Sequence, residues 1–376
     1  MIRRAFLIVA MLAGALQAQQ PSPSPSASPE PVTSSTPSPT PSPTPSPTPT
    51  ARTLREVINS LNDDEVEKAL QTFKEGFFDS SQVDESAVKR STLEGLVLRL
   101  SPGAAIVSAS SKASPGPQIP FLVEVLDAHI AYFRLGALTK DTLAQFDAAL
   151  ASFSEKEIDA VILDLRGISE SGDYETAAEF ARRICPKGKL LFSIQKPSAK
   201  QERIFTSNQD PAFQGVVVVL TDSDTSGAAE ALAGTLRLNA GAMIIGTHTT
   251  GEAVEFAEAP IGGNAMLRVA VAQVILPNSG SIFPDGVQPD VFISLPREAR
   301  EQIFRESKEK GVSQFVFDPE RRRMNEASLV ANLNPEIEAM QLAQRDRGKA
   351  PQLRDTVLQR AVDLVTAINF YKGKKQ

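Results

Sequence analysis

Hydroxyl side chains gather where an apolar run meets a stretch of small residues. The run GVVVVL at 215–220 predicts a buried strand, and TDSDTSGAAEALAGTLR at 221–237 predicts a polar turn followed by a helix. Such a junction can present a nucleophile at a helix N-terminus, where backbone amides stabilise developing negative charge. The turn offers two serines and a threonine, Ser226 among them, but Gly227 occupies the position where a serine is most expected. The sequence therefore has the layout of an active site without its obvious nucleophile.

Strands and helices alternate through the middle of the chain. The predicted strands are two within 121–136, one each at 159–165, 189–194, 215–220 and 242–246, and a strand pair within 265–280; the predicted helices lie at 140–157, 174–184 and 227–239. This alternation implies parallel strand–helix–strand units with helices on both faces of the sheet. We expect 161–165, 216–220 and 243–245 to be buried strands of one twisted, mainly parallel sheet, because their apolar runs are continuous.

Helical patterns flank this core. Apolar residues recur at helical spacing in 52–100 and again from about 297, and a Pro/Gly/Ser-rich connection separates the first helices from the core. The folded part of the chain is therefore predicted to comprise an N-terminal helical segment (52–117), the core (118–296) and a C-terminal helical segment (297–376).

The first 51 residues have the composition of an export signal and a spacer. Residues 1–18 carry two arginines, an apolar stretch and Ala-Leu-Gln-Ala, which is typical of a secretory signal peptide. Residues 19–51 are almost wholly Pro, Ser, Thr, Ala and Gln, which predicts a disordered, low-complexity spacer. We expect a protein exported to the periplasm or the extracellular space, with no transmembrane span after signal cleavage. An uncleaved membrane anchor is the alternative.

Composition excludes several classes of function. The net charge of −6 argues against a nucleic-acid partner. Cys185 is the single cysteine, so the chain has no intramolecular disulfide, and His129 and His248 are its two histidines. We therefore expect neither a metal site nor a cofactor.

The order of motifs resembles that of the carboxyl-terminal processing peptidases, also called tail-specific serine proteases. VILDLRG at 161–167 resembles the family's strand ending in Asp-Leu-Arg, and the segment 216–236 resembles the strand, turn and helix that carry the nucleophile. IIGTHTTGE at 244–252 resembles the segment with the catalytic lysine, and 275–293 resembles the stretch ending in Gly-[IV]-x-Pro-Asp. The resemblance covers most of residues 60–370. It implies an α/β fold with a mainly parallel twisted sheet of the tail-specific protease (ClpP/crotonase-like) type.

The family's catalytic positions carry other residues here. In the family a serine attacks and a lysine of lowered pKa acts as its base. The serine stands three residues before a glutamate that corresponds to Glu230, so its position falls on Gly227. The lysine position falls on Glu252, and the position of a supporting glutamine falls on Phe256. The spacing from Glu230 to Glu252 equals that of the family, so the alignment has not slipped.

Two further family features are changed. The Asn-Pro-Gly-Gly that follows Asp-Leu-Arg, and lends backbone donors to the oxyanion site, is replaced by GISESGDYE at 167–175. Gly172 and Ala228 mark what remains of that oxyanion region. The peptide-binding PDZ domain is also missing, because only 101–120 is available between the first helices and the core.

These departures predict a pseudopeptidase that binds peptides or envelope proteins without cleaving them. One alternative is an active serine endopeptidase with a relocated nucleophile, Ser226, and Glu252 as a new base. A second alternative is a structural envelope protein tethered by the spacer. The sequence leaves the partner and the oligomeric state open.

Overall fold

The computed structural model describes residues 54–76, 84–108, 119–153, 157–169, 173–317 and 353–373. The predicted signal peptide and spacer lie outside these residues and stay predictions. The chain divides into two units, Met1–Glu75 and Gly76–Gln376. Within the described ranges, no helix has both the length and the apolar character needed to cross a membrane.

The first unit contains α1 (Leu54–Asn59) and nearly all of α2 (Asp63–Gly76). Asn62 begins α2 with a reciprocal cap: its side chain accepts from the Glu65 amide at 2.9 Å, and its own amide donates to the Glu65 carboxylate at 2.9 Å. Acidic residues in the first turn complement the helix dipole. None of the α2 residues is buried.

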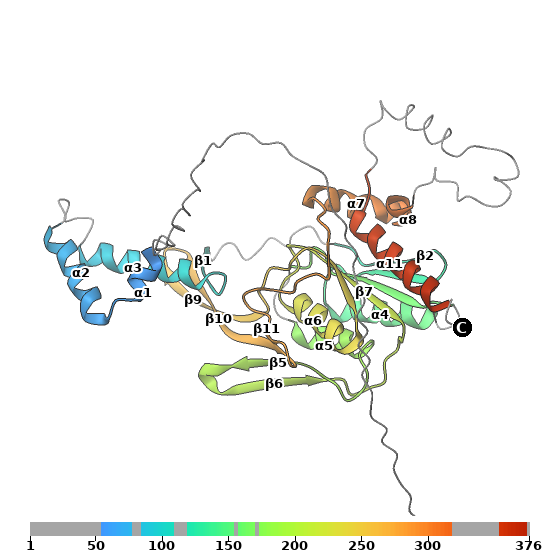
Figure 1. Cartoon of the computed structure of the whole chain (residues 1–376), viewed down its shortest axis with the longest axis horizontal. Helices are drawn as coiled ribbons and strands as arrows, with labels where there is room; N and C mark the ends of the chain where they lie inside the picture. The colour runs from blue at the N-terminus through green and yellow to red at the C-terminus, as the bar shows by residue number, and fades with distance from the viewer. Residues whose placement is uncertain are drawn as a thin grey trace, which may run out of the picture. The chain divides into compact units, whose positions relative to one another are not determined.

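The second unit contains a six-stranded sheet of order β12–β8–β7–β4–β3–β2. Figure 1 labels two of its strands, β2 and β7. Its strands are β2 (Leu122–Leu126), β3 (Ile130–Arg134), β4 (Ala160–Asp164), β7 (Val216–Thr221), β8 (Met243–Gly246) and β12 (Val291–Phe292). Neighbouring strands are parallel, except that β2 runs antiparallel to β3. The predicted strands β4, β7 and β8 are adjacent and largely buried, so the α/β fold with a mainly parallel sheet is confirmed.

Helices cover both faces of this sheet. On one face lie α4 (Lys140–Ser152), α5 (Tyr174–Arg182) and α6 (Ala228–Ala240), and on the other lie α8 (Ser313–Val316) and α11 (Thr356–Gly373). Alternate strand residues divide between the two cores, since Val161 and Leu163 join the first and Ala160 and Ile162 join the second. α3 (Glu85–Leu100) precedes the sheet, and α7 (Arg297–Lys310) follows it.

A second, antiparallel sheet corrects the sequence prediction in three places. It comprises β1 (Ala104–Ser108), β5 (Leu190–Lys196), β6 (Gln201–Thr206), β9 (Val254–Gly262), β10 (Ala265–Leu276) and β11 (Gly280–Ser281). β5 was expected in the parallel sheet but pairs with β6 and β10, because an apolar run does not specify its partner. The expected strand pair within 265–280 is mainly the single long strand β10, whose run contains no turn residue. β1 lies in the expected connection and pairs with β10.

Candidate active site

The turn between β7 and α6 places Gly227 at the N-cap of the helix. Gly227 has φ +60° and ψ −119°, a conformation that costs an L-residue about 1–3 kcal/mol. α6 begins directly after it at Ala228, and the first amides of a helix have no intrahelical acceptor. Serine nucleophiles sit on strained strand-to-helix turns of this kind. The backbone thus has the form of a nucleophile turn, but residue 227 has no side chain that could react.

Both carboxylate oxygens of Glu230 are occupied by hydrogen-bond donors. The side chain is completely buried in the first turn of α6. Oε1 accepts from the Thr249 hydroxyl at 2.5 Å and from the Gly251 amide at 2.6 Å. Oε2 accepts from the amides of Gly227 at 2.9 Å and Glu252 at 2.8 Å. One oxygen atom therefore holds together the backbone of residues 227 and 252.

The loop after β8 is closed against the turn at 284–287. The Thr249 hydroxyl accepts the Val287 amide at 2.7 Å while it donates to Glu230. A Cβ on Gly251, whose φ is +78°, would lie 1.9 Å from the Pro284 carbonyl oxygen, so only glycine fits there. Two of the motif segments thus contact the Glu230 carboxylate directly, and the third joins them through the Thr249 hydroxyl.

The turn after β4 packs against the turn before α6. The Gly167 amide donates to Asp222 Oδ1 at 3.0 Å, and the Ser226 amide donates to the Ile168 carbonyl at 2.9 Å. Arg300 of α7 forms an ion pair with the other oxygen of Asp222. The Gly167 amide is therefore bound to a carboxylate within the chain, and an oxyanion would have to displace that carboxylate to use it.

The remaining predicted site residues lie around this turn. Ser226 is 4% exposed, and no described residue hydrogen-bonds to its hydroxyl. Ala228 is buried as the first residue of α6. Gly172 lies outside the described residues. The structure therefore brings Ser226, Gly227 and Ala228 together with Glu252, and their roles stay predictions.

Glu252 and Phe256, which stand at the family's lysine and glutamine positions, lie in different surroundings. Glu252 is half-buried and is held by its backbone amide on Glu230. Phe256 lies in β9, and the guanidinium of Arg268 on β10 stacks on its ring, 3.7 Å from the centroid. A carboxylate at 252 supplies no amine, and the ring of Phe256 supplies no hydrogen bond to position a base.

Two buried ionisable groups, Glu230 and Tyr174, have raised pKa values. Burial raises the pKa of Glu230, and the hydrogen bonds from Thr249 and three backbone amides oppose that change. Burial and the charges of Glu230 and Glu255 raise the pKa of Tyr174, whose hydroxyl donates to the Val254 carbonyl at 3.0 Å. The Tyr174 hydroxyl is therefore protonated at neutral pH. Glu230 uses both oxygens on structural donors, so neither group is a free base.

A buried ion network beside these turns escaped the sequence analysis. Arg166 makes two hydrogen bonds to Asp164 at 2.9 and 2.6 Å, and two to Asp355 at 2.9 and 2.7 Å. Asp355 also caps α11 by accepting from the Leu358 amide at 3.0 Å. A capping signal, an aspartate before a helical pattern, was present at 355. Its partner is 189 residues away in the chain, so the pairing carries no local signal.

Replacing Gly227 by alanine is expected to lower the free energy of unfolding by about 1–3 kcal/mol, because the Cβ is strained at φ +60°. Chemical denaturation monitored by circular dichroism measures the change. Gly95→Ala is the matched control: Gly95 lies in α3 with open space around it, so alanine there should stabilise by about 0.4–1 kcal/mol. Equal effects at the two positions would contradict the backbone strain at 227.

The described part of the chain contains no group of three or more His, Cys, Asp or Glu residues arranged to hold a metal ion. Cys185 is buried, and burial raises the pKa of its thiol to about 12. His129 Nδ1 lies 2.6 Å from the Asp127 carbonyl oxygen, a backbone contact within its own turn.

Comparison with known proteins shows that these turns lie in a segment that matches a peptidase family. Residues 129–293 match the model of peptidase family S41. The chain is 27% identical over 167 residues to the carboxyl-terminal-processing protease of Synechocystis, which covers 44% of this chain and 38% of the relative. It is 24% identical over 168 residues to the carboxy-terminal processing protease CtpB of Bacillus subtilis, covering 44% and 34%. The chain therefore matches less than half the length of these relatives.

Among solved structures, the photosystem II D1 C-terminal processing protease is 22% identical, with a TM-score of 0.40. The match covers 56% of this chain and 53% of that one.

Proposed function

Since residues 129–293 match the model of peptidase family S41, we propose that this protein is an exported member that binds peptides or proteins without cleaving them. The main observation behind the proposal is that the hydrogen bonds of Glu230 are present while the reactive side chains beside it are absent. Its carboxylate holds the backbone amides of Gly227 and Glu252 together, yet neither residue offers a nucleophile or an amine base. The frame of a catalytic dyad is present, and its reacting groups are not.

Binding does not require the missing groups. An extended peptide can add to a sheet through main-chain hydrogen bonds, with side-chain pockets giving specificity. β6 is an outer strand of the described antiparallel sheet, and most of its residues are exposed. This arrangement supports peptide capture on the sheet, independent of chemistry at 227. The signal-like sequence at 1–18 supports an envelope or extracellular partner.

The geometry around Ser226 weighs against a relocated nucleophile. An activated serine needs a base within hydrogen-bond reach of its hydroxyl, and no described residue makes that contact. The Ser226 amide is tied to the Ile168 carbonyl, so the residue is fixed in the packed turn. Its side chain also leaves the backbone one residue before the position of the family's serine.

We expect the purified full-length chain to bind unstructured casein without cleaving it. Co-elution measures binding, and mass spectrometry of the same fractions measures cleavage. Loss of the nucleophile alone costs subtilisin about 10⁶ in kcat, so no cleavage above background is expected. Casein that is neither bound nor cut would favour the structural envelope protein instead.

Single and double variants distinguish an inactive site from a site with a relocated nucleophile. Gly227→Ser alone should not react with a fluorophosphonate probe, because Glu252 is no amine base. Gly227→Ser combined with Glu252→Lys restores both groups at family spacing and should give weak labelling of residue 227. Ser226→Ala should change neither result. Robust proteolysis by the unmodified protein that Ser226→Ala abolishes would overturn the proposal.

A further inference from the structure

The strand β6 leaves one edge of the antiparallel sheet open. It is the last strand in the order β1–β10–β5–β6, and Figure 1 shows it on the outer side of the β5–β6 hairpin. At its end, the Thr206 carbonyl accepts a hydrogen bond from Arg182 at 2.9 Å. The part of the edge without a partner among the described residues is therefore 201–205, and such an edge presents main-chain N–H and C=O groups to a further strand.

The charged side chains of β6 are engaged within the sheet. Glu202 accepts from Gln195 of β5 at 3.1 Å, and Arg203 forms an ion pair with Glu255 of β9. Natural sheet edges are commonly protected by a proline or an outward-pointing charge within the strand. β6 contains no proline, and its Ile204 is 62% exposed. The strand thus combines an open edge with an apolar side chain beside it.

Lysines lie at both ends of this edge. Lys196 and Lys200 flank the turn that precedes β6. Lys187 and Lys189 lie at the other end, because the amide of Ser207, directly after β6, donates to the Lys189 carbonyl at 2.8 Å. No described residue forms an ion pair or a hydrogen bond with any of these four lysine side chains. Each ammonium group is therefore available to a partner.

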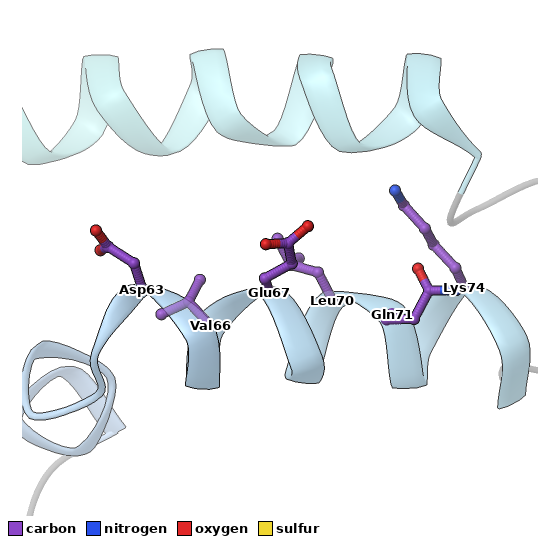
Figure 2. A pocket seen from close by; sticks show the side chains of 6 residues that line it. All are labelled: Asp63, Val66, Glu67, Leu70, Gln71 and Lys74. Atoms are coloured by element: carbon purple, nitrogen blue, oxygen red, sulfur yellow. The ribbon is translucent and has the colours of Figure 1, made fainter.

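The hairpin is positively charged in an acidic protein. Residues 187–206 carry five basic side chains and one acidic one, in a chain whose net charge is −6. The exposed face of α2 is different: Figure 2 shows Lys74 there together with two acids, Asp63 and Glu67. A surface of one charge sign attracts a partner of the opposite sign.

We propose that β6 binds an extended acidic segment of a partner protein as an added strand, an inference that rests on the proposed peptide binding. Main-chain hydrogen bonds along 201–205 supply the affinity. A segment with acidic residues on both sides of a centre about five residues (~17 Å) long would meet the lysines at both ends. An anionic membrane surface could use the lysines, but it would make no use of an open strand edge.

Fluorescence anisotropy of a labelled probe peptide with the full-length protein tests the proposal. The probe has a Thr-Val-Thr-Val-Thr centre and two glutamates at each end. Neutralising one lysine should weaken binding about two- to fivefold, and Lys196→Gln combined with Lys200→Gln about four- to 25-fold. The matched control is Lys74→Gln combined with Lys140→Gln, two exposed lysines outside the hairpin, which should leave the Kd unchanged.

Methylation of alternate amide nitrogens in the probe tests strand addition. Alternate residues of a strand direct their N–H groups to the same side, so one of the two methylation patterns should abolish binding and the other should preserve it. A probe that binds equally with either pattern, or with lysines in place of its glutamates, would overturn the proposal. So would binding to phosphatidylglycerol vesicles that the probe does not inhibit.

Failure of this docking site can be distinguished from failure of the proposed function. If the protein binds casein but not the probe, the docking site is wrong and peptide binding occurs elsewhere. If the protein binds the probe with the expected lysine dependence and also cleaves it, the docking site is correct and the absence of cleavage is wrong. Mass spectrometry of the probe after each titration separates these results.

Discussion

Replacing Arg166 by methionine is expected to lower the free energy of unfolding by roughly 3–5 kcal/mol, because it leaves two buried carboxylates without their cation. The side chains of Arg166, Asp164 and Asp355 are each no more than 1% exposed. Urea titration at neutral pH measures the loss.

The effect should reach α11 before it reaches the sheet. Asp355 caps that helix and joins it, through Arg166, to the end of β4. Without the guanidinium the repulsion between Asp164 and Asp355 favours release of the helix from its apolar face. Hydrogen exchange in 356–373 should therefore increase more than exchange in β7.

A surface arginine provides the matched control. Arg297 is 65% exposed and pairs with Glu301 at 3.0 Å, so Arg297→Met should cost less than about 1 kcal/mol. A similar cost for the two variants would show that the buried network contributes no more than a surface pair.

The same network fixes a dependence of stability on pH. Burial by itself raises the pKa of Asp164, but the charge and hydrogen bonds of Arg166 outweigh burial and lower it. A carboxyl whose pKa is lowered on folding stabilises the protein above its unfolded pKa of about 3.9. This contribution is lost as the pH falls through the folded value. The free energy of unfolding of the unmodified protein should therefore decrease as the pH falls through the folded pKa of Asp164.

Replacing Glu230 by glutamine is expected to cost about 2–5 kcal/mol, although the two side chains have nearly the same shape. Each carboxylate oxygen accepts two donors. In either orientation, the amide NH₂ of glutamine would face at least one backbone N–H that cannot turn away. Unsatisfied buried donors cost about 1–3 kcal/mol each. Thermal and urea unfolding both measure the loss.

The neighbouring carboxylate gives the control for this second variant. Glu252→Gln removes the same charge 22 residues later in the chain, but no described residue donates to the Glu252 side chain. Its expected cost is below about 0.5 kcal/mol, as for a surface substitution. A Glu230→Gln variant as stable as Glu252→Gln would contradict the four-donor arrangement.

Local pattern predicted the central elements of the fold. The apolar runs at β4, β7 and β8 favoured buried strands over helices, because each is short, continuous and rich in β-branched residues. The resemblance to the family's motifs separately predicted that Gly227 and Glu252 stand at the positions of its serine and lysine. The buried strands depend on neighbours within a few residues, which a sequence displays directly.

Partner choice was decided by tertiary structure alone. β5 has the same apolar character as the parallel strands but pairs with β10, more than 70 residues later in the chain. Arg166 could be placed at the end of a strand, but nothing near it pointed to Asp355. Glu230 was a landmark for alignment, and its four donors became apparent only when two turns met around it. Long-range pairing depends on which buried polar groups still need a hydrogen-bond partner after packing. The set of buried groups is defined only in the folded chain.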